Sequence, residues 1–547
     1  MFESIKGRFK PSEGSSLPFA STLDGLKVRI TQVNENRKMG ADLLFMITYM
    51  TSLAIANATR NEIFSFAANR EEYISSKYIA RVDAYVTKWS FSYAESLSLV
   101  AERTHNDILK NLLSRYSNAI ESGVPDDEFL KNELSATRSI YRSKVEEGLE
   151  MLRQWGDAYV AMLLSATVIA VTLMISIAIY SPQGMESTLG FSYAIVFSIC
   201  FFGNLLMYTS VPYDPKTHGL AERPSKEQQM IHSLERIAII LAIIAIIILL
   251  ALGINYGLIF LLVGILMAPL GIIGFIDDNN ISLRDRDFST FIRSFGSVMG
   301  GQSSTAVQAL GAIDRKSLAA LEDLLNSVYS KMNLGLDDRE IWDKYIGQAG
   351  SDLIYKYINI YLDIVKMGGP PEPIGNVVGS SILEQVLLRE KKDMHAKSFI
   401  MLLAPMHIAM AGIFVALYTI MVVLTGSVSG MMAHFREVSA AAGGAASAGV
   451  SAGTVVGGSI NMFSNFPEGP MMTFVIITLT IITLSNILAA RIVGGGDRYM
   501  YYFYAAIFCT LTGVVLLITP IVVHMFFSPE GLQAMGGAGK AVAGATV

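Results

Sequence analysis

Two short strings in the sequence carry residue types that could do chemistry. Gly449 to Gly453 place Ser451 in a G-x-S-x-G string, which in hydrolases holds a nucleophilic serine on a turn between a strand and a helix. No strand pattern precedes it, and its surroundings are so rich in glycine, alanine and serine that composition explains it. The second string, GGAGKAV near the end of the chain, lacks the first glycine and the hydroxyl residue of a phosphate-binding loop. We therefore expect the chain neither to use a serine nucleophile nor to hydrolyse ATP.

Metal ligation, redox chemistry and proton transfer have equally little support. The sequence has no H-E-x-x-H motif, and its two cysteines, Cys200 and Cys509, lie inside apolar stretches, which makes a disulfide or a zinc site unlikely by composition alone. His407 and His524 are the ionisable residues of the apolar stretches. A single histidine among apolar residues is more often a hydrogen-bonded packing residue than a proton relay. We predict no catalytic residue, no cofactor and no metal, and hence that the protein is not an enzyme.

The elements that must position these residues are membrane helices. The chain is 52% hydrophobic and 16% charged, with a mean hydropathy of +0.44. Ile237 to Ile276 contains no Asp, Glu, Lys, Arg or His, and at about 20 residues a crossing it is long enough for two. The sequence predicts an all-α polytopic protein with seven transmembrane helices, at residues 158–180, 189–211, 237–254, 256–276, 398–425, 471–490 and 499–527.

The basic residues predict the orientation of these helices. Every Lys and Arg except Arg436 and Lys540 falls in segments on the same side as the N terminus, which the positive-inside rule assigns to the cytoplasm. We expect a multi-pass protein of the cell membrane with a cytoplasmic N terminus and an external C terminus. The external loop 426–470 and the tail 528–547 are rich in glycine and alanine. The loop is either mobile or a small-residue surface for close helix packing.

Polar segments make up the remainder of the predicted organisation. Residues 1–41 form a basic arm that we expect to be partly ordered, and residues 42–157 and 277–397 form two cytoplasmic helical modules. The stretch DLLFMITYMTSLAIANA, which begins at Asp42, is apolar enough to be mistaken for a crossing. It is short and rich in Thr, Ser and Asn, so we expect a buried helix of the first module instead.

The two modules contain a repeated pattern. Shifting the chain by 212 positions places Gly123 on Gly335 and Asp126 on Asp338. Each glycine stands where a helix would end in a left-handed conformation, and each aspartate where the next helix would begin. Both modules are therefore expected to contain a helix, a glycine turn and a second helix, and both lead directly into a crossing. Buried stripes at equivalent spacing support the repeat: Leu109, Leu112, Leu113, Tyr116 and Ile120, and Leu321, Leu324, Leu325, Val328 and Met332.

These segments resemble a known family. ILKNLLSRYSNAIESGVPDDEFL and ALEDLLNSVYSKMNLGLDDREIW, each preceding apolar crossings, are similar to the tandem cytoplasmic F-domains of the inner-membrane platform proteins in type II secretion and type IV pilus machines. The extra crossings and the opening MGADLLFMITYMTSLAIANATRNEIFSF resemble the archaeal, archaellum-assembling branch of this family. The resemblance covers about residues 40–527 and rests on architecture and helical patterning.

The resemblance implies a fold, a function and partners. Each F-domain would be an antiparallel helical bundle, and the chain would be the membrane platform on which pilin-like or archaellin subunits are assembled for motility. A hexameric secretion-type ATPase would be its partner, and the platform would be a homo-oligomer. The four crossings between the modules and the extra C-terminal pair depart from the bacterial pattern, so the copy number does not transfer. Alternatives are an adhesive pilus or type II-like secretion platform and, more distantly, a transporter or a scaffold or sensor.

Basic residues near the membrane are the candidate ATPase-docking residues. Headgroup attraction to membrane lipids explains such bases equally well, and the small net charge of −5 gives no indication of nucleic acid binding. The helix SILEQVLLREKKDMHAK has no glycine or proline before the fifth crossing, so it could pass a displacement into the membrane. The candidate residues are Arg284, Arg286, Arg293, Arg389, Lys391, Lys392 and Lys397.

Overall fold

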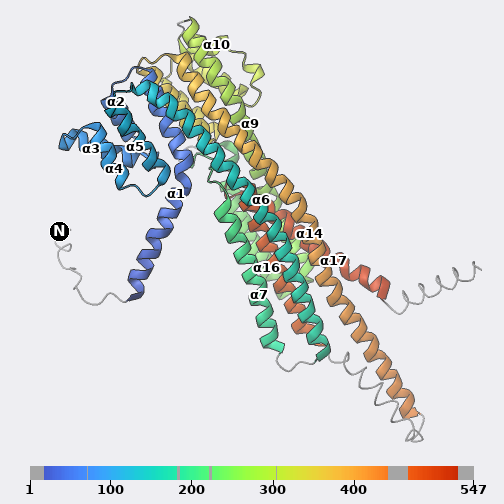
Figure 1. Cartoon of the computed structure of the whole chain (residues 1–547). Coiled ribbons are helices and arrows are strands. Elements are labelled where there is room, and N and C mark those ends of the chain that lie inside the picture. The colour runs from blue at the N-terminus through green and yellow to red at the C-terminus, as the bar shows by residue number, and fades with distance from the viewer. Residues whose placement is uncertain are drawn as a thin grey trace, which may run out of the picture. The chain divides into compact units, whose positions relative to one another are not determined.

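The described part of the chain is built from helices (Figure 1). This computed structural model describes residues 18–70, 72–180, 185–220, 224–302, 305–441 and 466–527. Within these ranges the β-structure is an isolated bridge between Thr217 and Ser351. The elements are α1 (Pro18–Ile55), α2 (Arg60–Ala68), α3 (Ser76–Trp89), α4 (Tyr93–Glu102), α5 (Asp107–Glu121), α6 (Asp126–Tyr180), α7 (Met185–Ser210), α8 (Lys226–Ala251), α9 (Tyr256–Gln302), α10 (Ala306–Ala312), the 3-10 turn η1 (Arg315–Ser317), α11 (Glu322–Asn333), α12 (Asp338–Ala349), α13 (Asp352–Lys366), α14 (Pro371–Ala441), α16 (Glu468–Gly494) and α17 (Met500–Phe527).

Seven of the described helices are long and apolar enough to cross a membrane. They are α6, α7, α8, α9, α14, α16 and α17, and each overlaps one of the seven predicted crossings. The predicted all-α polytopic fold is therefore confirmed. Three of these helices extend far beyond a single crossing, since α6 has 55 residues, α9 has 47 and α14 has 71.

The chain divides into two compact units, and the first combines residues 1–141 with residues 359–381. Its core includes the second half of α1, where Leu44, Met46 and Leu53 are at most 1% exposed. The apolar stretch that begins at Asp42 is thus a buried helix and is not among the candidate crossings, as expected. The two units do not follow the borders of the predicted modules, because residues 359–381 pack with the first: Ser381 Oγ lies 3.0 Å from Thr48 Oγ1.

The glycine turns of the repeat are present. Gly123 and Gly335 have φ angles of 73° and 71°, in the left-handed region that favours glycine. At both turns the following residue closes a six-residue loop: Val124 N donates to the Ala119 carbonyl at 2.9 Å, and Leu336 N to the Lys331 carbonyl at 3.4 Å. This is the Schellman arrangement that ends helices.

The two modules reach the membrane through different helices. In the first module, the helix after the glycine, α6, continues to Tyr180 through the predicted first crossing. In the second module the corresponding helix, α12, ends at Gly350, whose φ of 73° stops it. The helix α13 follows, and then α14 begins inside the second module and continues through the predicted fifth crossing.

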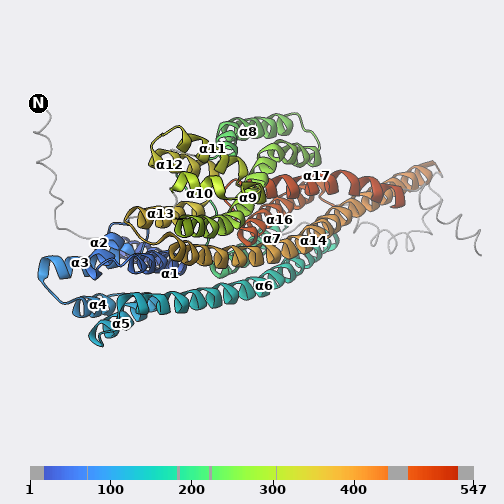
Figure 2. The ribbon, with the colours of Figure 1, turned by 90° about the horizontal axis from the view of Figure 1, so that it is seen from above.

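In the second unit, residues 142–358 and 382–547, α6 and α14 run side by side in the same direction (Figures 1 and 2). Arg142 Nε donates to Glu384 Oε1 at 2.5 Å, and further along Lys391 Nζ donates to Glu146 Oε1 at 2.9 Å. Closer to the membrane, Gly156 lies against the ring of Phe399. Positions on the two helices thus increase together, so the first and fifth crossings have the same direction.

A second helix pair, α9 and α17, runs antiparallel. Gly257 faces Leu517, Gly264 faces Thr510 and Gly271 faces Phe503. A Cβ at Gly271 would lie 2.5 Å from the Cα of Phe503, so the two backbones approach more closely than side chains allow. Glycines at this spacing permit tight helix packing in membranes. The fourth and seventh crossings consequently have opposite directions, as alternating crossings require.

Polar side chains join the crossings to one another. Asn204 on α7 donates to Ser485 Oγ on α16 at 2.7 Å, and Asn486 lies 2.9 Å from His407 Nδ1 on α14. His407 Nε2 lies 2.8 Å from Thr512 Oγ1 on α17. The two asparagines therefore form hydrogen bonds to other helices. His407 is a hydrogen-bonded packing residue, as predicted. Such bonds hold helices together where the hydrophobic effect does not.

Some sequence predictions lie outside the described residues. These are the G-x-S-x-G string around Ser451, the glycine-containing string around Lys540, residues 442–465 of the external loop, and the tail 528–547. The beginning of the predicted loop is helical, because α14 extends past residue 425 to Ala441. The predicted arm also becomes helical, at Pro18 in the first turn of α1.

Candidate functional site

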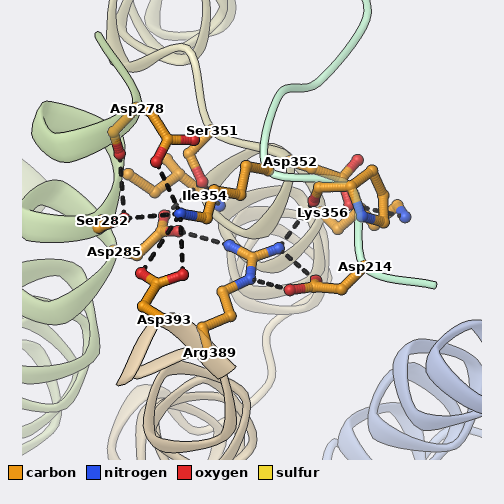
Figure 3. A network of polar contacts seen from close by, with 12 residues as sticks. Asp214, Asp278, Ser282, Asp285, Ser351, Asp352, Ile354, Lys356, Arg389 and Asp393 are labelled. Atoms are coloured by element: carbon orange, nitrogen blue, oxygen red, sulfur yellow. Dashed lines mark hydrogen bonds and ion pairs between the residues drawn. The ribbon is translucent and has the colours of Figure 1, made fainter. Parts of the chain in front are cut away.

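A buried ion cluster lies where the loop between α7 and α8 meets α9, α13 and α14 (Figure 3). At its centre is Arg389 of α14, which is 6% exposed. Its Nε and Nη2 donate to the two carboxylate oxygens of Asp214 at 2.7 and 2.6 Å, and Nη1 donates to Asp285 Oδ2 on α9 at 2.6 Å. Nη2 also donates to the Pro215 carbonyl at 2.7 Å. One planar guanidinium therefore joins the loop to two helices, a task for which arginine is suited.

Lys216, two residues along the loop, makes the second connection. Its Nζ lies 2.8 Å from Asp278 Oδ2 on α9 and 3.4 Å from Asp393 on α14, with Ser282 Oγ also at 3.4 Å. The side chain is 5% exposed. Arg389 and Asp393 are one helical turn apart on the same face of α14. The loop places a charge of opposite sign against each of them, Asp214 against Arg389 and Lys216 against Asp393.

Backbone contacts fix the loop further. Asp352 N, at the start of α13, donates to the Lys216 carbonyl at 3.0 Å, and His218 N donates to the Gly350 carbonyl at 3.4 Å. Thr217 Oγ1 donates to Asp497 Oδ2, in the turn between α16 and α17, at 3.0 Å. A short stretch of loop thus contacts α9, α14, the turn before α13 and the turn before α17, and connects the ends of several crossings.

The two carboxylates that Arg389 binds, those of Asp214 and Asp285, have pKa values shifted in opposite directions. Burial raises the pKa of Asp285 to about 6, even though Arg389 and a hydrogen bond donated by Ser351 favour its ionised form. Burial acts on Asp214 too, but the facing guanidinium outweighs it and the pKa of Asp214 is lowered. Burial is also outweighed at Arg389, whose pKa the two carboxylates raise. Asp214 is therefore the permanent counter-ion of Arg389, while Asp285 sits close to titration near neutral pH.

The arrangement holds elements in place and offers no reactive group. Arginine, lysine and aspartate are bound to one another, and the nucleophile or acid–base pair that catalysis needs is not built by these contacts. In the part of the chain that the structure describes, no group of His, Cys, Asp and Glu side chains is placed to hold a metal ion. The contacts bind the loop to α9 and α14.

Two known proteins match most of the chain. The flagella accessory protein J of Methanocaldococcus jannaschii is 22% identical over 383 residues, and that of Methanococcus voltae is 23% identical over 390 residues. Each match covers 67% of this chain and 67% of the relative. The chain is similar to flagella accessory protein J. No family model matches the chain, and no solved structure does.

The similarity to flagella accessory protein J confirms the resemblance to the archaellum branch that the sequence indicated. It does not by itself assign roles to the candidate docking residues. The seven candidate docking residues fall into three groups by exposure: buried, partly buried and exposed. Arg389 and Lys392 are buried, at 6% and 7% exposure. In this structure they contribute to the interior of the protein, and a docking partner cannot reach them without a rearrangement.

The other candidate bases differ in how much they are exposed. Arg284 is partly buried, and its Nη1 donates to the Ala349 carbonyl at 3.1 Å. Arg293 is also partly buried. Arg286, Lys391 and Lys397 are exposed. Among the seven candidate docking residues, these three are the ones that a partner or a lipid headgroup could contact directly.

Sequence reasoning missed the acids and the loop lysine of the cluster, Asp214, Lys216 and Asp285. A signal for Asp285 was present, because it continues the apolar stripe of Ile281 and Phe288 at helical spacing. A charged residue on a buried stripe must find a partner. The sequence could not identify that partner, since Asp285 and Arg389 are 104 positions apart.

Proposed function

We propose that the chain is the membrane platform of an archaellum assembly machine. The similarity to two flagella accessory proteins over 67% of their length is the observation that carries the proposal. The seven membrane helices and the long polar segments support it. In this function the chain couples a cytoplasmic hexameric ATPase to the insertion of archaellin subunits and performs no catalysis of its own. We also propose that it acts as a homo-oligomer with its N terminus in the cytoplasm and its C terminus outside.

The proposed route of force is α14. This helix runs without interruption from Pro371 to Ala441, through the ion cluster and then through the fifth crossing. While Arg389 and Asp393 are bound to the loop, a displacement of α14 also loads that loop. The loop in turn connects α7 and α8. A displacement of α14 is thereby shared among several crossings, which a platform for filament assembly requires.

We propose that the exposed bases Arg286, Lys391 and Lys397 belong to the ATPase-docking surface. They lie on α9 and α14, the two helices that the cluster joins. A triple reversal to glutamate should lower the affinity of the purified chain for the ATPase in a detergent pull-down by at least tenfold. Arg153→Glu, also an exposed base but on α6, is the matched control. Unchanged ATPase affinity together with reduced binding to anionic lipid vesicles would show that these bases serve the headgroups instead.

The function itself is tested by gene deletion and complementation. Cells lacking the gene should form no archaella in electron micrographs and should not swim, and the wild-type gene should restore both. Normal archaella with a loss of adhesive pili would replace the proposal with its nearest alternative, a platform for another pilus. Intact filaments of both kinds would overturn it and return attention to a transporter or a sensor.

A further inference from the structure

Lys392 is a buried cation that makes no ion pair in the described part of the chain, although Asp214 and Asp393 attract it from farther away. It is 7% exposed, yet no carboxylate lies within ion-pair distance of it among the described residues, whereas Arg389 and Lys216 each bind two. Burial lowers the pKa of Lys392. Its ammonium lies in a space left by Gly495, where a Cβ would be 2.9 Å from Nζ. An unpaired charge at such a site costs free energy, so its presence needs an explanation.

The explanation lies in the spacing along α14. Lys392 is three residues, close to one helical turn, after Arg389 and on a neighbouring part of the same face. A movement of α14 by three residues toward its own N terminus is a translation of about 4.5 Å. It would carry Lys392 to the level of Asp214 and Asp285, which Arg389 now occupies. Helices that move past one another by about one turn are a known form of two-state switch.

We propose that α14 has two stable registers against α9 and the α7–α8 loop. In the register described here Arg389 binds Asp214 and Asp285, and in the second Lys392 takes its place. Asp214 and Asp285 therefore keep a cation in both registers. The cation without an ion pair is Lys392 in the first register and Arg389 in the second. This inference goes beyond the proposed function and does not depend on it, since it concerns an equilibrium of the chain alone.

Removing Arg389 should favour the second register without any motor. Spin labels on Thr290→Cys of α9 and Met394→Cys of α14, both exposed positions, report the register, while Cys200 and Cys509 are buried. Because the helices are antiparallel at the cluster, the movement brings the labels together. In lipid nanodiscs, Arg389→Met should shorten their distance by about 3 Å relative to wild type.

Two double variants decide the result. Arg389→Met with Lys392→Met should keep the wild-type distance, because no cation is left to bind the acids in the second register. Arg389→Met with Lys391→Met, the matched control on the adjacent exposed lysine, should shorten the distance as the single variant does. An unchanged distance in folded Arg389→Met, or the same shortening without Lys392, would overturn the proposal.

A second measurement does not require Arg389→Met to fold. If Lys392 has no partner in the described register, Lys392→Met should raise the midpoint of thermal unfolding in detergent, because it removes an unpaired buried charge. Lys391→Met should leave the midpoint unchanged. A clear decrease for Lys392→Met would show that the lysine is already paired in the resting chain and would contradict the two-register account.

Discussion

At the scale of single residues, Arg389 influences the pKa values of two buried carboxylates. Its guanidinium donates twice to Asp214 and once to Asp285. Both carboxylates are buried, and a single cation cannot offset the burial of both equally. The result is one acid whose pKa is lowered and one whose pKa is raised to about 6.

Because the pKa of Asp285 is raised, we predict a pH dependence of the unfolding free energy that the Asp285→Asn variant lacks. Burial raises the pKa of Asp285 from 3.8 to about 6, so the folded chain binds this proton more tightly than the unfolded chain does. The stability contributed by the protonated form is present below pH 4 and is lost as the pH rises through 6. The unfolding free energy of wild type minus that of Asp285→Asn should therefore fall by up to about 3 kcal/mol between pH 4 and pH 6.

Thermal unfolding in detergent across this pH range provides the measurement. The difference between the two proteins should be level again above pH 7, where Asp285 is ionised in both the folded and the unfolded chain. A difference that stays constant from pH 4 to pH 7, or one that grows as the pH rises, would show that this carboxyl has an ordinary pKa in the folded protein.

At the scale of elements, the packing of α9 against α17 depends on the absence of side chains. A Cβ on Gly264 would meet Thr510 Oγ1 and would lie 2.8 Å from the Thr510 backbone nitrogen. The helices would have to separate, which overpacking makes unfavourable by about 1–3 kcal/mol. We expect Gly264→Ala to lower the unfolding midpoint in detergent.

Gly412 on α14 provides the control for this prediction. It also lies in a crossing helix, but a Cβ there has nothing within 4 Å. Alanine favours helix more than glycine does, so Gly412→Ala should keep or raise the midpoint. Equal decreases in both variants would mean that loss of any helix glycine matters, rather than the close approach of α9 and α17.

The elements also show what the sequence could and could not predict. Gly123 and Gly335 were predicted to be left-handed turns, because a helix end is encoded by a few adjacent residues. The seven crossings were likewise visible as continuous apolar stretches. The end of α12 at Gly350 was not predicted, since the apolar pattern alone gave no signal there. The ion cluster required contacts between residues far apart in sequence, which no local pattern contains.

At the scale of the whole molecule, the directions of the crossings predict a pattern of exposure. If the N-terminal side is cytoplasmic, Arg286 on α9 is inside the cell and Asn255, between α8 and α9, is outside. A membrane-impermeant maleimide should label Asn255→Cys in intact cells and Arg286→Cys only after permeabilisation. Labelling of Arg286→Cys in intact cells would reverse the orientation, and equal labelling of both would contradict the crossing between them.

We propose that the chain passes displacement from a motor into the membrane through the uninterrupted helix α14. Four glycines inserted between Asp393 and Met394 would leave the cluster residues and the fifth crossing intact but break the helix between them. The decisive measurement is the number of archaella per cell, counted by electron microscopy in deletion cells that carry this variant at wild-type membrane level and with wild-type ATPase binding. The account predicts none or very few, and a wild-type number of filaments would contradict it.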